Sequence, residues 1–236
     1  MILGRFWMRG RDPDLTQARE AMVARDLKAR GIRDPRVIEA MRAVPREMFV
    51  PPELYREAYA DRALPIGHGQ TISQPYIVAL MIEALALRGG ETVLEVGVGS
   101  GYATAVLSQI ANWVVGVERV PELAEGARER LRALGIENVT IHVGDGRYGW
   151  RDEAPYDEIL VSAAAPEVPA ELAEQLADGG RLVIPVGEET GTQVLTAVIR
   201  RGREFEAQAL CSCKFVPLVG GDDGLIEGRT AAPDGT

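Results

Sequence analysis

The sequence predicts an α/β fold: a Rossmann-like, doubly wound and mostly parallel sheet with an antiparallel final strand and an N-terminal helical part. Three observations lead to this fold class. From residue 92 onwards short β-rich runs alternate with helical stretches, a glycine-rich turn joins the first of these runs to a helix, and two adjoining strand-like runs end the series. Such alternation places helices on both faces of a parallel sheet. The 236 residues, 46% of them hydrophobic, are enough for one large core.

The first third of the chain is predicted to be helical. Residues 15–31 carry apolar side chains at helical spacing, and Gly31 is a natural stop because glycine readily adopts the left-handed conformation that ends helices. Asp34 is expected to cap a second helix over residues 35–41, which begins with a proline. Further prolines then interrupt the helical pattern, and residues 61–74 are predicted to form an extended loop that contains two glycines.

A third, apolar helix is predicted at residues 75–87, and the alternating part of the chain follows it. The predicted strands are residues 92–96, 113–117, 139–143, 158–162 and 181–185. The helices expected between them are residues 102–110, 121–134 and 169–176.

The end of the chain is expected to form an antiparallel hairpin. Residues 193–199 and 204–215 are its two strands, and the turn between them contains Gly202. After Gly220 the sequence is rich in Gly, Asp and Ala, which predicts a mobile tail. We therefore divide the chain into an N-terminal part with helices and a loop (1–74), a Rossmann-like core with the hairpin (75–220) and the tail (221–236).

Composition excludes several classes of function. The net charge of −9 argues against a nucleic-acid binder, because neutralising phosphates requires clustered Lys and Arg. No apolar run approaches the roughly 18 residues of a membrane span, and the first residues lack a signal-peptide core, so a cytoplasmic location is expected. Cys211 and Cys213 are expected to be buried free thiols, since a disulfide across two positions of one strand would be strained. No His or Cys cluster completes a metal site, so no metal is expected.

The strongest local signal is a glycine-rich turn between a predicted strand and a predicted helix. Its glycines are Gly97, Gly99 and Gly101, and Glu95 stands two residues before the first of them. A dinucleotide fingerprint requires its third glycine at position 102, where this chain has Tyr102. The spacing G-x-G-x-G after an acidic residue instead resembles motif I of the class I methyltransferases.

Two further carboxylates stand at strand ends on the same edge of the predicted sheet. Glu118 follows Gly97 by 21 residues, where an acidic residue can accept hydrogen bonds from a ribose diol, and Asp145 follows the third strand. No lysine follows the glycines, which excludes a P-loop. Carboxylates without a basic partner for a pyrophosphate fit S-adenosylmethionine better than NAD. The expected cofactor-binding residues are Glu95, Gly97, Val98, Gly99, Gly101, Glu118, Arg119, Asp145 and Gly146.

The glycine-bearing loop that runs into the helix at Pro75 predicts an anion site. Helix N-termini present unpaired N–H groups, so an anion is stabilised there, and Ser73 or Gln74 stands at or near the N-cap. Two interpretations remain open at this point. Ser73 either caps its own helix, or its hydroxyl and the nearby backbone amides hold a substrate carboxylate. His68 in the same loop is not needed as a base, because a carboxylate with a pKa of about 4 is already ionised at pH 7.

Taken together, several motifs resemble the protein-L-isoaspartate O-methyltransferase family, in order, from about residue 20 to residue 220. The most diagnostic are Thr-Ile-Ser-Gln-Pro at 71–75 and Phe-Val-Pro-Leu at 215–218; the others are at 45–51, 66–70, 95–102, 144–146, 179–182 and 185–187. The resemblance implies that Ser73 is the catalytic residue and that S-adenosylmethionine is the cofactor. It also implies that an isoaspartyl peptide is held by Thr71, Ile72, Ser73, Gln74 and Val216.

The expected reaction is an in-line transfer of a methyl group to the isoaspartate carboxylate. The resulting ester can close to a succinimide, and hydrolysis of the succinimide returns some normal aspartate, which amounts to protein repair. The expected partners are isoaspartyl peptides and proteins, with no nucleic acid, membrane or metal. Alternatives are a related methyltransferase that acts on aspartate of one dedicated peptide, a non-catalytic nucleotide-binding relative and, least favoured, a small-molecule methyltransferase or dehydrogenase.

Overall fold

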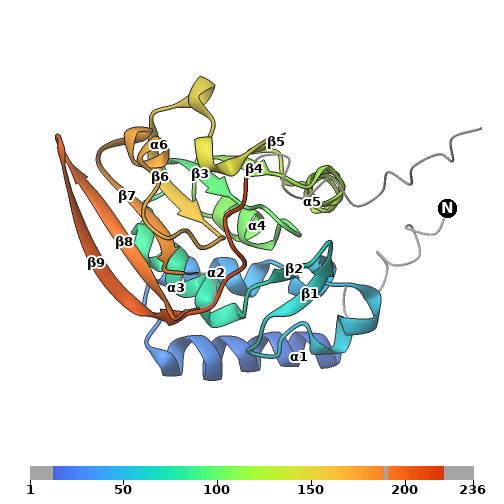
Figure 1. Ribbon diagram of the computed structural model, residues 1–236. Helices are drawn as coiled ribbons and strands as arrows, with labels where there is room; N and C mark the ends of the chain where they lie inside the picture. The colour runs from blue at the N-terminus through green and yellow to red at the C-terminus, as the bar shows by residue number, and fades with distance from the viewer. Residues whose placement is uncertain (1–12, 189–190, 221–236) are drawn as a thin grey trace, which may run out of the picture.

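A seven-stranded sheet forms the centre of the computed structural model, which describes residues 13–188 and 191–220 (Figure 1). The strand order is β5-β4-β3-β6-β7-β8-β9. Strands β3 to β7 run parallel to their neighbours, β8 runs antiparallel to β7, and β9 returns antiparallel to β8. The predicted fold class is therefore confirmed. The strands are β3 (Thr92–Val96), β4 (Trp113–Glu118), β5 (Val139–Val143), β6 (Tyr156–Val161), β7 (Leu176–Val186), β8 (Gln193–Arg201) and β9 (Glu204–Cys213).

Helices cover both faces of this sheet, as its pattern of side chains requires. Alternate strand residues belong to two different hydrophobic clusters, so that Val93 packs on one face and Leu94 on the other. The first face is covered by α1 to α5, and the second by α6 with the segment around Trp150. The helices are α1 (Pro13–Ala21), α2 (Pro35–Ala43), α3 (Pro75–Leu85), α4 (Tyr102–Ser108), α5 (Pro121–Ala133) and α6 (Ala170–Glu174).

The N-terminal helices follow the prediction, with one change in hydrogen bonding. The predicted helix over residues 15–31 begins as α1, then continues as a π-helical segment (Met22–Leu27) and a 3-10 turn (Lys28–Arg30). It ends at Gly31, whose φ of 106° lies in the left-handed region. The side chain of Asp34 accepts a hydrogen bond from the Arg36 amide at 2.8 Å, which confirms it as the cap of α2.

The segment before α3 is not the extended loop that the sequence predicts. It contains a small antiparallel hairpin of β1 (Leu64–Gly67) and β2 (Gln70–Ile72). His68 takes the left-handed φ of 53° at its turn. Strands of four and three residues are too short to show an alternating pattern, which is why the sequence did not reveal them. The hairpin matters because β2 leads directly into the segment before α3.

The second difference lies at the boundary between α6 and β7. The sequence predicts a helix over 169–176 and a strand over 181–185, whereas α6 ends at Glu174 and β7 begins at Leu176. Leu172 and Leu176 are both fully buried and stand four residues apart, which is the spacing of a helix. The two residues nevertheless belong to different elements, α6 and β7. Pairing of Leu176 with Tyr156 in β6 decided the outcome.

The remaining described segments are short 3-10 turns that connect the main elements. They are Arg46–Phe49, Pro52–Glu57, Gly146–Tyr148 and Arg151–Glu153. Cys211 and Cys213 are free thiols, and they are half-buried, not fully buried as expected. No helix within residues 13–188 and 191–220 combines the length and apolarity needed to cross a membrane. The predictions for the first residues and for the tail after Gly220 concern segments outside the described residues.

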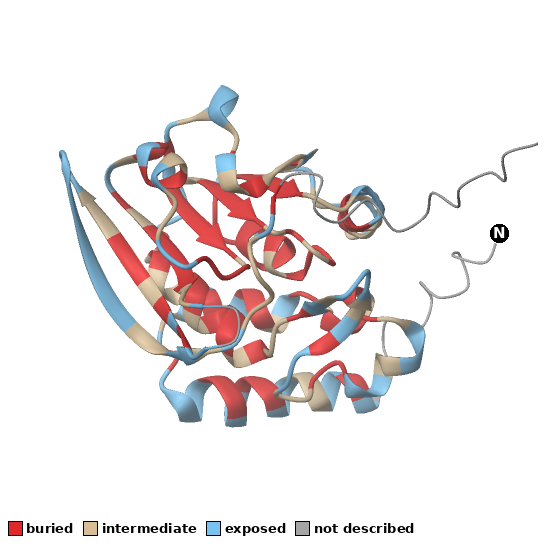
Figure 2. Ribbon diagram, viewed as in Figure 1, coloured by how far each residue is buried: buried red, intermediate tan, exposed pale blue. Residues whose placement is uncertain are grey.

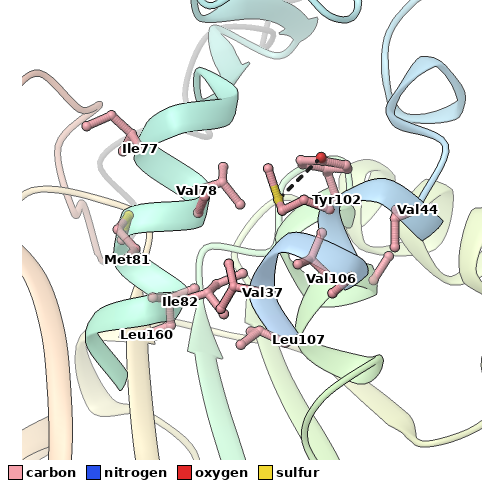
Figure 3. Packing of buried hydrophobic residues seen from close by; sticks show 14 of the residues in the cluster. Val37, Val44, Ile77, Val78, Met81, Ile82, Tyr102, Val106, Leu107 and Leu160 are labelled. Carbon is pink, nitrogen blue, oxygen red and sulfur yellow. Dashed lines mark hydrogen bonds between the residues drawn. The ribbon is translucent and has the colours of Figure 1, made fainter. Parts of the chain in front are cut away.

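Helix α2 packs against both α3 and α4, and apolar residues of all three helices belong to one hydrophobic core. Buried residues concentrate on the inner strands and the helix faces that meet them, while the outer strand β9 is largely exposed (Figure 2). Val78, Met81 and Ile82 of α3 face the same core as Val37 of α2 and Val106 of α4 (Figure 3). Burying side chains of this size contributes about 1.5–3 kcal/mol each. The helix that follows the predicted anion site is thus held in place by its apolar residues.

Candidate active site

A cavity lies at the carboxyl ends of β3 and β6, where the strand order reverses direction and where open α/β sheets bind their ligands. The chain leaves β3 through Gly97 and leaves β6 through Ser162. A Cβ atom added to Gly97 would meet the Ser162 Cβ at 3.6 Å. That distance is an ordinary van der Waals contact, so glycine is favoured here by the backbone: φ at Gly97 is 84°, which other residues rarely adopt.

Glu118 joins the glycine-rich turn to the end of β4. One carboxylate oxygen, Oε2, accepts the Gly99 amide at 2.8 Å, and the other, Oε1, accepts the Val120 amide at 2.9 Å. Each oxygen has two lone pairs, so both can accept a further hydrogen bond. Glu118 is 7% exposed and lines the cavity, where it can receive two hydroxyl groups of a ribose.

Glu95 lines the same cavity and has no partner among the described residues. Its side chain is fully buried, and neither carboxylate oxygen is hydrogen-bonded. Burial raises the pKa of Glu95 to about 8. The nearby charge of Glu118 also raises this pKa, whereas the Thr104 hydroxyl lowers it. A buried carboxyl group without a partner suits a ligand that brings a positive charge. The donor set therefore fits the expected cofactor, which carries both an ammonium and a sulfonium group.

Most of the predicted cofactor residues meet in this cavity, and two do not. Asp145 is not part of the lining. Its carboxylate accepts the Arg147 amide at 3.0 Å and Arg147 Nη2 at 2.8 Å, and it caps the turn that presents Gly146. Gly101 packs against α5 instead, since an added Cβ would lie 3.0 Å from the Ala127 Cβ. The predicted residues that line the cavity are Glu95, Gly97, Val98, Gly99, Glu118, Arg119 and Gly146.

Ser73 does not cap α3. Gln74 is the N-cap residue, and no side chain makes a capping hydrogen bond there. Among the described residues the Ser73 hydroxyl has no hydrogen-bond partner, so the interpretation of Ser73 as a helix cap is wrong. The hydroxyl is available to a ligand instead.

The expectation that the first amides of α3 are free for an anion is also wrong. Pro75 has no N–H group, and the Tyr76 amide donates to Asp61 Oδ1 at 3.2 Å. The Ile77 and Val78 amides both bond to the Gln74 carbonyl, at 3.1 and 3.2 Å. A carboxylate of the protein itself thus occupies the helix end, which satisfies the positive pole of the helix. An anion beside Ser73 must be bound by the Ser73 hydroxyl and groups that precede the helix.

A second, adjoining groove opens between Ser73 and the end of β9. Thr71, Gln74 and Val216 also line it, and these were predicted as substrate residues; Ile72 lines the first cavity. Ser162 was not predicted, although its position directly after β6, at the ligand-binding edge, is a signal that could have identified it. The residues that line both spaces are Thr71, Ser73, Ser162, Val216 and Pro217.

Hydrogen bonds hold the segment with Val216 against the chain that leaves β6. The Ala164 amide donates to the Val216 carbonyl at 2.8 Å, and the Leu218 amide donates to the Ala164 carbonyl at 2.7 Å. The Phe215 amide donates to Gln193 Oε1 at 2.6 Å. The Phe-Val-Pro-Leu motif thus forms a fixed wall at the junction of the two spaces.

The histidines and acidic residues do not form another reactive centre in the part of the chain that the structure describes. His68 lies at the β1–β2 turn and lines neither space. His142 stacks on Trp150 with ring centroids 3.9 Å apart and lies 2.9 Å from Glu153 Oε1, so it supports the segment after β5. No group of three or more His, Cys, Asp or Glu side chains in this part could hold a metal ion.

The sequence is similar to one family over most of its length. The family model described as protein-L-isoaspartate(D-aspartate) O-methyltransferase matches residues 17–223. Protein-L-isoaspartate O-methyltransferase 2 of Pelobacter propionicus is 55% identical over 205 residues, which cover 86% of this chain and 91% of that protein. A Methylorubrum populi protein-L-isoaspartate O-methyltransferase is 58% identical and covers 86% of this chain and 96% of its own.

Solved structures of the same family are also similar to this chain. A protein-L-isoaspartate O-methyltransferase superposes with a TM-score of 0.77 at 33% identity and covers 87% of this chain and 67% of its own. A Plasmodium falciparum structure, described as such a methyltransferase in complex with S-adenosyl-L-homocysteine, has a TM-score of 0.73 at 30% identity. It covers 85% of this chain and 98% of its own.

Proposed function

The chain belongs to the protein-L-isoaspartate(D-aspartate) O-methyltransferase family, and on that premise we propose which of its residues carry out S-adenosylmethionine-dependent methylation of isoaspartyl carboxylates. One observation supports the assignment above the others. Ser73, whose hydroxyl has no partner among the described residues, lines both the cavity of the strand-end carboxylates and the adjoining groove. Methyl transfer requires donor and acceptor to meet, so it belongs at this junction.

The first cavity is the proposed cofactor site. S-adenosylmethionine supplies an electrophilic methyl group on a sulfonium when bound there. Glu118 accepts the ribose hydroxyls, and Glu95 faces the ammonium group, which favours its ionised form. Gly97 and Gly99 allow close approach of the backbone because they lack a Cβ, and Val98 lines the cavity between them. Arg119 and Gly146 complete the contacts, while Gly101 and Asp145 shape the site by holding the glycine-rich turn and the turn at Gly146.

The adjoining groove is the proposed site of the isoaspartyl peptide. The Ser73 hydroxyl donates to the substrate carboxylate and orients one oxygen toward the first cavity. Thr71, Gln74 and Val216 line this groove and hold the peptide, and Ile72 contacts it from the first cavity. No general base is required, because the carboxylate is already ionised at pH 7. Catalysis is therefore mainly positioning, which can supply roughly 7–11 kcal/mol of the barrier.

The chemistry after transfer needs no further group of the protein. A methyl ester is a better electrophile than a carboxylate, so the following backbone nitrogen can close a succinimide, and hydrolysis returns some normal aspartate. The proposed partners are isoaspartyl peptides and damaged proteins. We also propose a cytoplasmic location, which cell fractionation would test.

A labelling experiment tests the substrate. The protein is incubated with methyl-labelled S-adenosylmethionine and with matched peptides that differ only in carrying aspartate or isoaspartate. Base-labile label is expected on the isoaspartyl peptide alone, because only there does a carboxylate reach Ser73 in the required position. Equal labelling of both peptides would indicate a methyltransferase that accepts aspartate, and no labelling of either would overturn the proposed function.

A further inference from the structure

Arg46 is an unusual residue in this fold because its guanidinium is completely buried without a carboxylate partner among the described residues. It lies in the turn Arg46–Phe49 and is 0% exposed. Arg46 forms no salt bridge within the described part of the chain, and its Nη1 has no hydrogen-bond partner there. Burial of a charge normally requires pairing with an opposite charge, since desolvation is expensive. A guanidinium stays charged in proteins, so groups other than a carboxylate must stabilise the charge of Arg46.

Its contacts join the two halves of the proposed active site. Nε donates to the Ala58 carbonyl at 2.7 Å, and Nη2 donates to the Ser73 carbonyl at 2.7 Å. The guanidinium carbon lies 4.7 Å from the centre of the Tyr102 ring, a cation–π contact. Tyr102 directly follows the glycine-rich turn and lines the cofactor cavity. One side chain therefore touches both the residue that orients the acceptor and the element that carries the donor site.

The Tyr102 ring is itself held in place by its neighbours, so it can fix the position of the Arg46 guanidinium. Its hydroxyl donates to Met41 Sδ at 3.6 Å (Figure 3), and Phe49 packs edge-on against it with ring centroids 5.6 Å apart. The Ser73 carbonyl, by contrast, precedes the N-cap of α3 and takes no part in the hydrogen bonds of that helix. Arg46 is thus the polar contact that sets the peptide plane after Ser73.

We propose that Arg46 is a positioning residue for methyl transfer, which holds Ser73 at a fixed distance from the glycine-rich turn through the Ser73 carbonyl and the Tyr102 ring. This inference rests on the proposed role of Ser73. A displacement of about 1 Å at a reacting centre can lower the rate of reaction 100-fold, so the contact acts on kcat. Cofactor affinity depends chiefly on Glu95 and Glu118, which Arg46 does not contact, and Tyr102 stays held by Met41 and Phe49.

Three variants separate positioning from simple stability: Arg46→Met, Arg46→Lys and, as a matched control, Arg181→Met. Arg181 Nη1 also donates to a backbone carbonyl, that of Ala84 at 3.2 Å, but at the opposite end of α3. For each variant kcat and KM are measured with an isoaspartyl peptide, S-adenosylhomocysteine affinity by calorimetry, and Tm by calorimetric melting. Arg46→Met is expected to lower kcat about 10- to 100-fold with less than about threefold change in S-adenosylhomocysteine affinity. Arg46→Lys, which can reach one carbonyl, should recover part of kcat, and Arg181→Met should leave kcat unchanged.

A double-mutant cycle with Ser73→Ala decides whether Arg46 acts through Ser73. If it does, Arg46→Lys or Arg46→Met should lower kcat much less in the Ser73→Ala background than in the native protein. Fully multiplicative losses, or an unchanged kcat in both Arg46 variants, would overturn the proposal. If Arg46→Met does not fold, the cycle with Arg46→Lys gives the answer. Normal turnover of Ser73→Ala alone would instead contradict the proposed role of Ser73, so the two failures are distinguishable.

Discussion

At the residue scale, two carboxylates in one cavity have different environments and therefore different tasks. Glu118 accepts two backbone amides, so it holds the glycine-rich turn at the cavity that it lines. Glu95, two residues before the first glycine, has no such donors and is fully buried, which raises its pKa to about 8. The sequence could identify both residues as acidic groups at strand ends, but only packing shows that Glu118 has backbone partners and that Glu95 is buried without one.

The raised pKa of Glu95 predicts pH-dependent binding of S-adenosylhomocysteine. Below pH 8 the group is largely protonated in the free protein, and an ammonium ion favours the ionised form, so binding must release a proton. Affinity should therefore rise with pH between pH 6 and pH 8, by at most about tenfold per pH unit. Calorimetry in buffers of different ionisation enthalpy measures the released proton. Glu95→Gln should remove most of the pH dependence, and a native protein with constant affinity over this range would refute the prediction.

At the element scale, the glycine-rich turn combines two separate requirements. Gly97 supplies a φ of 84° where the chain leaves β3 at the cavity, whereas Gly101 permits the close approach of α4 to α5. The spacing of the glycines predicted a turn that binds a ligand, and it could not distinguish these roles.

The β1–β2 hairpin is a second feature at the element scale. Its pairing depends on Leu64 and Ile72, which are buried against the core and not part of a local pattern.

Replacing Gly101 by alanine tests the packing role of this glycine. The variant should lower the free energy of unfolding by about 2–4 kcal/mol, because alanine is strained at φ of 89° and its Cβ would lie 3.0 Å from Ala127. Gly202→Ala is the matched control. Gly202 has φ of 63° with nothing within 4 Å, so only the backbone strain of about 1–2 kcal/mol applies. Urea denaturation measures both, and equal losses would show that the contact with Ala127 relaxes.

At the scale of the whole molecule, the sheet brings together residues that are far apart in the chain. Glu95, Glu118, Ser162 and Val216 come from four different segments, and Ser73 reaches them from outside the sheet. A site assembled in this way exists only in the folded state. Ligand binding must therefore stabilise the fold as a whole.

The predicted stabilisation can be measured by denaturation with and without S-adenosylhomocysteine. At 100 times its Kd, the ligand should raise the free energy of unfolding of the full chain by about 2.7 kcal/mol. Glu118→Ala should show a clearly smaller rise at the same ligand concentration, because it loses the acceptor for the ribose. Arg181→Met, far from the cavity, should keep the full rise. An equal rise in the Glu118 variant would exclude this carboxylate from the ligand site.

The sequence by itself determined the fold class, most strand positions and several of the residues that line the first cavity. These depend on signals local to the chain: alternation of strands and helices, a glycine-rich turn after a buried strand, and acidic residues at strand ends. The family, too, was identifiable from short motifs such as Thr-Ile-Ser-Gln-Pro.

Tertiary structure alone decided which groups are available. Asp61 occupies the end of α3 where a substrate anion was expected, Asp145 is bonded to Arg147 and does not line the cavity, and Arg46 reaches Ser73 across 27 positions of sequence. The spacing of residues along the chain does not predict these contacts. A polar side chain bonds to whichever group lies near it once the chain has packed. The sequence supplied the acidic residues and hydroxyls; the packing of α2, α3 and α4 determined which of them face a ligand.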